Sequence, residues 1–370
     1  MPDFIEQELS RLKKDGLYRQ LKQIDPGTLV FCSNDYLGLS QHPRVKAAAS
    51  AAIAKYGWGA GASRLISGNS PLQEELERKI ADFKGREAAI VFPTGYMANL
   101  GAISSLVDEH DAIIIDRLDH ASIIDACRLT KAKFQVYRHN DPDALAAALQ
   151  RSAKFKKRLI VTDSVFSMDG DLAPLPEIVA LAKEYDALTM IDEAHATGTI
   201  GPTGRGLEEY FNLKGQVDIV MGTLSKAVGS VGGFVAGSQE LIDYLRNKAR
   251  SFIYTTALPP AACAASLEAL KIIEQEPELI AKLWANIEYF GTRYQVPGTR
   301  NSPIIPIIIG NAEKTIEISQ MLLEKNIFVS AIRPPTVPQG ESRLRITISA
   351  THQKEEIECL ASSLRALIPA

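Results

Sequence analysis

The stretch TMIDEAHATGTIG, residues 189–201, places charged and polar side chains directly behind an apolar run. The run ALTMID (187–192) predicts a buried strand that ends on Asp192, and His195 follows three residues later. A carboxylate and an imidazole are therefore expected together at the carboxyl end of one strand. Taken alone, the pair could also be a buried turn cap and a core histidine whose hydrogen bonds are satisfied.

The letters DEAH in this stretch also occur in helicases, where the two acids serve a magnesium–nucleotide site. That function requires a loop of the form Gly-x-x-x-x-Gly-Lys-Ser/Thr to hold the phosphates. The dipeptide Gly-Lys occurs nowhere in the chain, which argues against a helicase. The glycine-rich segment GWGAGASRLISGN (57–69) follows no strand and does not fit a dinucleotide fingerprint, so we expect a close-packed loop near the active site.

Similar apolar runs recur along the middle of the chain, with helix-like segments between many of them. The runs are AAIVF (88–92), AIIID (112–116), KFQVY (133–137), RLIVTD (158–163), VDIVMG (217–222) and GGFVAG (232–237). The helix-like segments include Pro71–Lys84, Pro142–Arg151 and Pro176–Tyr185. This alternation predicts an α/β fold with a mostly parallel sheet covered on both faces. Ligands bind beyond the carboxyl ends of the strands in such sheets.

The two ends of the chain follow a different pattern. We expect an N-terminal arm over residues 1–40, a large domain over 41–277 and a small C-terminal α+β domain over 278–370. The small domain should carry an antiparallel sheet built from PIIPIII (303–309), IFVSAI (327–332) and RLRITIS (343–349).

Composition and charge exclude several classes of function. The net charge is only −3 and both signs are interspersed, so nucleic acid or an anionic membrane is not an expected partner. No apolar run reaches the roughly 20 residues that span a bilayer, and the charged N-terminus does not resemble a signal peptide. Four scattered cysteines without a Cys-x-x-Cys pair argue against structural zinc and disulfides. We therefore expect a cytoplasmic protein.

Lys226 is the second candidate for chemistry, in VMGTLSKAVGSVGGFVAG (220–237). A lysine that forms imines must be uncharged part of the time, and an apolar setting of small residues lowers an amine's pKa. Thr223, three residues earlier, could place its hydroxyl on a phosphate. Alone, Lys226 could be a solvated loop residue, but an Asp-x-x-His strand end 34 residues earlier favours a cofactor site.

Pyridoxal phosphate fits the combination of Lys226 with Asp192. The cofactor acts as an electron sink only while its ring nitrogen is protonated, and a nearby carboxylate keeps it so. Asp192 is the candidate for this role. His195 or Ser167 could donate to the phenolic oxygen of the ring.

Two further segments offer the remaining contacts. His120 in DRLDHASIID could stack on the ring face. FPTGYMANL (92–100) predicts a helix start after a strand, so the backbone amides of Gly95 and Tyr96 could bind the phosphate.

Six motifs match one family in order along nearly the whole chain. They are SNDYLGLS (33–40), DRLDHAS (116–122), VFSMDGD (165–171), IDEAHATG (191–198), TLSKAVG (223–229) and RLRITISA (343–350). The chain resembles the α-oxoamine synthases, which are pyridoxal-phosphate enzymes of the aminotransferase-like fold type I. The segment AIRPPTVPQGESRLRITISATH (331–352) is similar to that of family members that use a pimeloyl thioester.

The resemblance implies a role for each matched residue. Lys226 is then the Schiff-base lysine and acid/base, Asp192 pairs with the ring nitrogen, and His120 stacks on the ring. The phenolic oxygen is contacted by His195 and Ser167, and the phosphate by Gly95, Tyr96, Thr223 and, from a second subunit of a homodimer, Thr255. The substrate side comprises Arg345 as the clamp for the amino-acid carboxylate, with Asn34, Arg19 and Arg333.

The implied reaction is the decarboxylative condensation of L-alanine with pimeloyl-CoA or a pimeloyl carrier protein, in biotin biosynthesis. Two alternatives stay open: condensation of glycine with acetyl-CoA, and a non-catalytic subunit of the same fold. Arg19 and Arg333 would be partners for the distal carboxylate of the acyl chain, or else surface residues. Only thirteen residues separate Arg19 from Ser33, so the arm is shorter than in the relatives considered.

Overall fold

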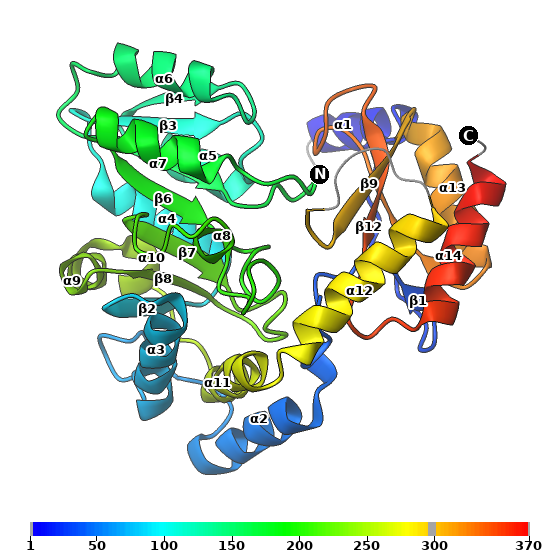
Figure 1. The fold of residues 1–370 in the computed structure, drawn as a ribbon, viewed down its shortest axis with the longest axis horizontal. Helices are drawn as coiled ribbons and strands as arrows, with labels where there is room; N and C mark the ends of the chain where they lie inside the picture. The colour runs from blue at the N-terminus through cyan, green and yellow to red at the C-terminus, as the bar shows by residue number, and fades with distance from the viewer. Residues whose placement is uncertain (1–2, 295–300, 369–370) are drawn as a thin grey trace. The chain divides into compact units, whose positions relative to one another are not determined.

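The computed structural model describes residues 3–294 and 301–368, which divide into two units. One unit contains residues 34–167 and 171–282, and the other contains residues 1–33, 168–170 and 283–370 (Figure 1). We call them the large unit and the small unit. The three-part division at residues 40 and 277 stays a prediction.

A seven-stranded sheet forms the centre of the large unit. Its strand order is β2-β8-β7-β6-β5-β3-β4, and β8 alone runs against its neighbours. The strands are β2 (Ala88–Phe92), β3 (Ala112–Asp116), β4 (Lys133–Tyr137), β5 (Arg158–Asp163), β6 (Leu188–Asp192), β7 (Ile219–Thr223) and β8 (Gly233–Gly237). The expected mostly parallel sheet is confirmed. Each strand falls on an apolar run because a sheet covered on both faces buries every side chain of its central strands.

Helices connect and cover these strands. They are η1 (Leu39–Gln41), α2 (Pro43–Tyr56), α3 (Pro71–Lys84), α4 (Gly95–Leu106), α5 (Ala121–Leu129), α6 (Pro142–Arg151), α7 (Leu175–Glu184), α8 (Leu207–Tyr210), α9 (Gln239–Lys248), α10 (Arg250–Ile253) and α11 (Pro260–Gln275). Local signals fix their ends. Proline occupies the first turn of α3, and Gly85 ends that helix with a φ of 63°. Asp141 caps α6 by accepting from the amide of Ala144.

The core of the large unit lies between the sheet and its helices. Ile113, Ile115, Val161 and Val235 from the sheet are fully buried with Ile103 from α4. Strand β4 lies at one edge, and there Phe134 and Val136 remain partly exposed. This packing holds the carboxyl ends of the parallel strands in a fixed row.

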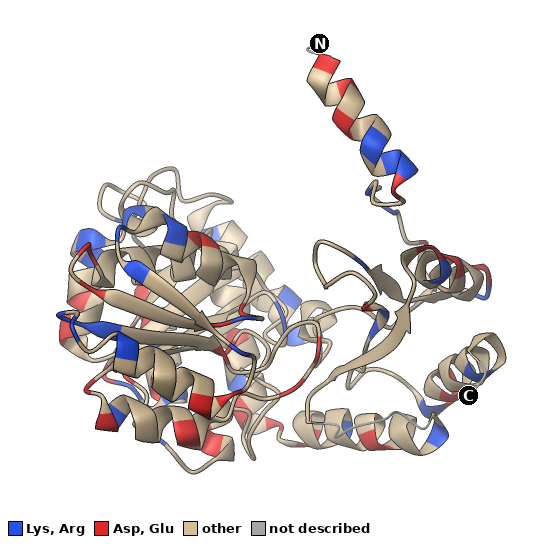
Figure 2. Ribbon diagram, turned by 90° about the horizontal axis from the view of Figure 1, so that it is seen from above, with Lys and Arg blue, Asp and Glu red and all other residues tan. Residues whose placement is uncertain are grey.

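The small unit has its own antiparallel sheet, in the order β11-β12-β9. Its elements are α1 (Asp3–Lys14), β1 (Leu29–Val30), β9 (Ile304–Gly310), α13 (Ala312–Glu324), β10 (Ile327–Phe328), β11 (Ser330–Ile332), β12 (Ser342–Thr347) and α14 (Lys354–Leu367); α12 (Glu278–Arg293) has residues in both units. Figure 2 shows acidic residues near the start of α1 and basic residues at its end, which favours the helix dipole.

The run IFVSAI, expected as one strand, forms two. Residues Ile327–Phe328 pair in parallel with β1, whereas Ser330–Ile332 pair with β12. The break falls on Val329, whose carbonyl accepts a hydrogen bond from the hydroxyl of Ser319. A short apolar run does not encode which partner each half will meet.

No helix within the described parts of the chain is long and apolar enough to cross a membrane.

Candidate active site

Polar side chains gather at the row of carboxyl strand ends in the large unit. They enclose a cavity of about 210 Å³. Eight predicted residues line it: Gly95, Tyr96, His120, Ser167, Asp192, His195, Thr223 and Lys226. The structure therefore brings together all the side chains that were expected around a cofactor ring and its phosphate, apart from Thr255.

Lys226 lies within hydrogen-bonding distance of His195. Its Nζ is 2.9 Å from Nε2 of His195, and Nδ1 of the same ring is 2.7 Å from the hydroxyl of Tyr36. Tyr36 is fully buried, and its hydroxyl also donates to Oδ1 of Asn34 over 3.1 Å. The imidazole is thus fixed from both sides, and it orients the amine that would attack a carbonyl carbon.

Asp192 is buried and presents both carboxylate oxygens to specific donors. Asn99 donates from Nδ2 to Oδ2 over 2.7 Å, and the amide of Ala194 donates to Oδ1 over 2.8 Å. Asn99 also donates to the hydroxyl of Ser122 at 2.9 Å. These bonds fix the orientation of the carboxylate at the edge of the cavity.

His120 is held at the rim of the cavity by its backbone and by its ring. The carboxylate of Asp163 accepts from the amide of His120 over 2.8 Å, and Nδ1 of the ring is 2.8 Å from the hydroxyl of Ser122. Burial lowers the pKa of His120, against the charge of Asp192, so the neutral ring is favoured. Tyr96 packs edge-on at a centroid distance of 6.4 Å.

Asp163 itself is buried beneath this rim. Burial, followed by the charges of Asp192 and Asp119, raises its pKa well above the usual range of an aspartate. The neutral carboxyl is therefore favoured at Asp163.

The start of α4 forms the other end of the cavity. Thr94 caps the helix by accepting from the amide of Met97 over 3.1 Å. A Cβ added to Gly95 would lie 3.2 Å from Met221 and 3.3 Å from Thr223, so glycine keeps this approach open. The hydroxyl of Thr223 lies 2.8 Å from that of Ser225. A helix N-terminus flanked by hydroxyls is a favourable phosphate site.

The residues present fit pyridoxal phosphate. A lysine amine, a carboxylate, a flat imidazole face and a helix N-terminus all border one cavity. In addition, Oδ1 of Asn99 is buried without a hydrogen-bond partner, which leaves an acceptor for a donor group brought by a ligand.

Seven residues that line this cavity were not predicted as site residues: Thr94, Asn99, Ser122, Asp163, Ala194, Met221 and Ser225. One signal could have found Asn99, because it follows Gly95 by four positions on α4 and therefore shares its face. Tyr36, which contacts His195, had no such signal because 159 residues separate the two.

The predicted substrate-side residues and Thr255 do not line the cavity. Asn34 accepts a hydrogen bond from the hydroxyl of Tyr36, which in turn contacts His195. Thr255 follows α10 in the large unit. Arg345 is buried in β12, and Arg19 and Arg333 border a different cavity in the small unit.

That cavity of the small unit has a volume of about 680 Å³ and a positive lining. Arg19 donates to the hydroxyl of Thr336 over 3.1 Å, and Arg333 donates to the carbonyl of Tyr18 over 2.7 Å. Lys13 and Lys22 also line it, whereas none of its described lining residues is acidic. Burial, and then the charge of Arg19, lowers the pKa of Arg333. The cavity is therefore suited to an anion.

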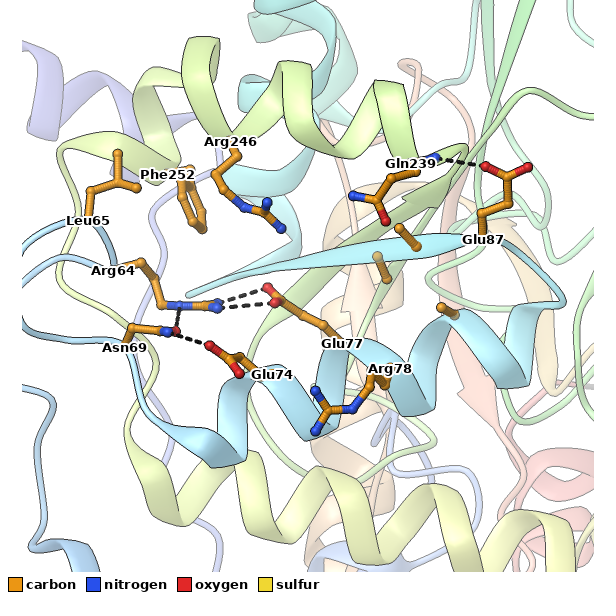
Figure 3. Close-up of a pocket in the computed structure, with 13 residues that line it drawn as sticks. Arg64, Leu65, Asn69, Glu74, Glu77, Arg78, Glu87, Gln239, Arg246 and Phe252 are labelled. Carbon is orange, nitrogen blue, oxygen red and sulfur yellow. Dashed lines mark hydrogen bonds and ion pairs between the residues drawn. The ribbon is translucent and has the colours of Figure 1, made fainter.

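A third cavity, of about 420 Å³, lies in the large unit beside α3, β2 and α9 (Figure 3). Arg64 forms a bidentate ion pair with Glu77 at 2.8 and 3.1 Å, and Glu77 also accepts from the amide of Val91. Asn69 joins Arg64 to Glu74. These charged groups satisfy one another and hold α3 against the edge strand, which is a structural role.

Comparison with known proteins places the chain in a well-defined group. A family model described as aminotransferase class I and II matches residues 26–364. The 8-amino-7-oxononanoate synthase of Thermoanaerobacter pseudethanolicus is 47% identical over 96% of this chain and 94% of that protein. The protein of that name in Citrifermentans bemidjiense is 48% identical over 97% of this chain and 96% of its own length. A serine palmitoyltransferase from S. paucimobilis, solved with bound PLP and myriocin, is 34% identical with a TM-score of 0.92, over 99% of this chain and 96% of that one.

Proposed function

The chain belongs to the class I and II aminotransferase family, and from that premise we propose that it condenses L-alanine with a pimeloyl thioester, releasing carbon dioxide and 8-amino-7-oxononanoate. The resemblance to the α-oxoamine synthases that the sequence motifs indicate is confirmed. The observation that carries the proposal is the single cavity that holds Lys226, Asp192 and His120 together. The protein is accordingly a pyridoxal-phosphate-dependent acyltransferase.

Each cavity residue has one task in holding the cofactor. Lys226 would bind it covalently through Nζ, Asp192 would hold the proton on its ring nitrogen, and His120 would stack on the ring face. His195 and Ser167 would contact the phenolic oxygen. The phosphate would be bound by the helix start at Gly95 and Tyr96 and by the hydroxyl of Thr223.

When bound, pyridoxal phosphate supplies the electron sink that stabilises negative charge on the α carbon of the amino acid. Nζ of Lys226 would take the α proton of the bound amino acid and would later return a proton to the product. His195 is placed to orient this amine, since its Nε2 is already 2.9 Å from Nζ. The hydrogen bonds from Asn99 and Ala194 hold the carboxylate of Asp192 in place.

The substrate side of the proposal uses the small unit. Arg345 would clamp the carboxylate of alanine in a bidentate manner. The acyl chain ends in a second carboxylate, and the positive cavity at Arg19, Arg333 and Thr336 has the charge and the hydroxyl to bind it. The absence of acidic side chains among its described lining residues supports this assignment.

We further propose a cytoplasmic homodimer. Thr255 does not line the cavity of its own chain, which agrees with the expectation that it reaches the phosphate of a second subunit. Exposed apolar side chains on the large unit, among them Trp58, Ile66 and Tyr254, support a covered surface in the assembly. Sedimentation equilibrium would test this, since an active monomer would contradict it.

The proposal is tested by supplying the purified protein with pyridoxal phosphate and then with substrates. A visible absorption band should form and shift when L-alanine is added. Carbon dioxide and 8-amino-7-oxononanoate should appear only after a pimeloyl thioester follows, as detected by mass spectrometry. Pimeloyl-CoA and a pimeloyl carrier protein are supplied in separate arms, and their kcat/KM values identify the natural acyl donor.

Three outcomes would change the conclusion. Turnover of glycine with acetyl-CoA alone would keep the cofactor and move the chain to the sister reaction. Cofactor binding without turnover of either pair would indicate a non-catalytic subunit. A protein that does not bind pyridoxal phosphate would overturn the role of Lys226.

A further inference from the structure

His139 lies outside the cofactor cavity, yet both of its ring nitrogens contact carboxylates. Nδ1 is 3.0 Å from Oδ1 of Asp116, and Nε2 is 2.7 Å from Oδ2 of Asp171. An ionised carboxylate only accepts hydrogen bonds, so both nitrogens must carry a hydrogen, as they do in the imidazolium. Burial alone would lower the pKa of His139, but the hydrogen bonds and charges of Asp116 and Asp171 outweigh it and raise the pKa to about 10.

One end of this clamp is anchored to the sheet. Asp116 is the last residue of β3 and is buried. Its carboxylate also accepts from the amides of Leu118 and Asn140, over 2.8 and 2.9 Å. Together with the contact to His139, these hydrogen bonds bring three groups to the carboxylate, so Asp116 has little freedom to move.

The other end holds the segment that carries Ser167. Asp171 accepts from Nδ2 of Asn140 over 2.8 Å as well as from His139. The backbone carbonyl of Asp171 also accepts a hydrogen bond from the amide of Phe166 over 3.0 Å. This bond directly joins residues 164–167 to residues 171–173, which we call the two arms. The ring of Phe166 meets that of His139 edge-on, at a centroid distance of 4.4 Å and an angle of 89°.

Ser167 follows Phe166 directly and lines the cofactor cavity. The position of its hydroxyl therefore depends on the two arms, and the arms depend on Asp171. Val165 and Leu172 form one further backbone bridge between them. Among the described residues, His139 and Asn140 tie the side chain of Asp171 to the end of β3, so that loss of His139 would leave Asn140 alone in this role.

We propose that His139 is a positioning residue for the cofactor, whose ring holds residues 164–167 and 171–173 to the end of β3 and thereby presents the hydroxyl of Ser167 to the ring of pyridoxal phosphate. The inference rests on the proposed function. It assigns His139 no contact with substrate or cofactor, so its effect must pass through Ser167.

The test is a double-mutant cycle on cofactor affinity, measured with apo-protein and added pyridoxal phosphate. His139→Gln and Ser167→Ala should each weaken binding by about tenfold (about 1.4 kcal/mol), since each would weaken or remove the hydrogen bond between the hydroxyl of Ser167 and the cofactor. If His139 acts through Ser167, the double variant should bind no more weakly than Ser167→Ala. His110→Gln, at an exposed histidine of the same unit, is the matched control and should bind as the wild type does.

A second variant guards against loss of the fold. Asp171→Asn breaks the same contact from its partly exposed end, and it should shift the visible band of the bound cofactor in the same direction as His139→Gln. Multiplicative losses in the double variant would assign His139 a general structural role and overturn the inference. Wild-type affinity in His139→Gln would also overturn it, whereas a wild-type protein that binds no pyridoxal phosphate would refute the proposed function instead.

Discussion

Asn99 donates a hydrogen bond from Nδ2 to Oδ2 of Asp192 over 2.7 Å, across 93 positions of sequence. The bond joins α4, whose first turn lines the cavity, to the end of β6. It fixes the carboxylate that would hold the proton on the cofactor ring. One side chain thereby couples the two ends of the site.

Replacing Asn99 by alanine should lower kcat by about 10- to 100-fold, because a hydrogen bond to a charged group contributes about 1.5–3 kcal/mol. The KM for the thioester should change little, since Asn99 is not among the residues proposed to bind the acyl chain. Steady-state kinetics with a pH titration of the cofactor absorbance measures both effects. An unchanged titration with an unchanged kcat would show that Asp192 is held adequately by Ala194 alone.

Lys226→Ala should abolish turnover, because no other amine among the described lining residues of the cavity can take its place. Borohydride reduction of the wild type should add the mass of the cofactor to the peptide that contains Lys226. The variant should show no such addition. Labelling of another lysine, or activity close to that of the wild type, would refute the assignment.

Arg19→Gln should raise the KM for the pimeloyl thioester by about tenfold, because a charged hydrogen bond to the distal carboxylate is lost. The KM for L-alanine should stay unchanged. Arg11→Gln is the matched control, since Arg11 lies on the same N-terminal segment but pairs with Glu8. An equal effect on both substrates would place Arg19 elsewhere than at the acyl chain.

The strands and the central pair of the site could be predicted because both depend on local patterns. Strands buried on both faces read as short apolar runs, and β2 (Ala88–Phe92) and β3 (Ala112–Asp116) match their predicted runs residue for residue. In parallel sheets, polar residues that follow such runs must meet at one edge. Asp192 and Lys226 were predicted on that ground and lie in one cavity.

The supporting residues could not be predicted because their partners are remote in sequence. Tyr36 contacts His195 across 159 positions, and His139 contacts Asp171 across 32. The sequence does not reveal which group will form a hydrogen bond with a given buried polar side chain. Likewise, the split of IFVSAI between β10 and β11 depends on two strands from elsewhere in the chain.

Lys84→Met should destabilise the protein by about 3–5 kcal/mol, because removing one partner of a buried ion pair leaves an uncompensated charge. Nζ of Lys84 lies 2.5 Å from Glu193, and both side chains are almost inaccessible, at 2% and 1%. Adding Glu193→Gln should recover part of the loss. Lys79→Met, which breaks a partly exposed pair with Glu274, is the control and should cost about 1 kcal/mol or less. Equal shifts in the thermal midpoints of the two single variants would contradict this account.

The contribution of His139 to stability should depend on pH in a direction that its pKa fixes. The pKa is raised from 6.5 to about 10 in the folded state, so folding strengthens proton binding at this ring. The stabilisation is therefore complete below about pH 6.5 and is lost as the pH rises through about 10. The carboxyl groups that face the ring are those of Asp116, from β3, and of Asp171, from the adjoining segment. The free energies of unfolding of the wild type and of His139→Gln should therefore differ most near pH 6, by on the order of 2 kcal/mol, and should converge towards pH 10. Thermal unfolding of both proteins at each pH measures this difference. A gap that is constant with pH would mean that the ring stabilises the fold without its charge.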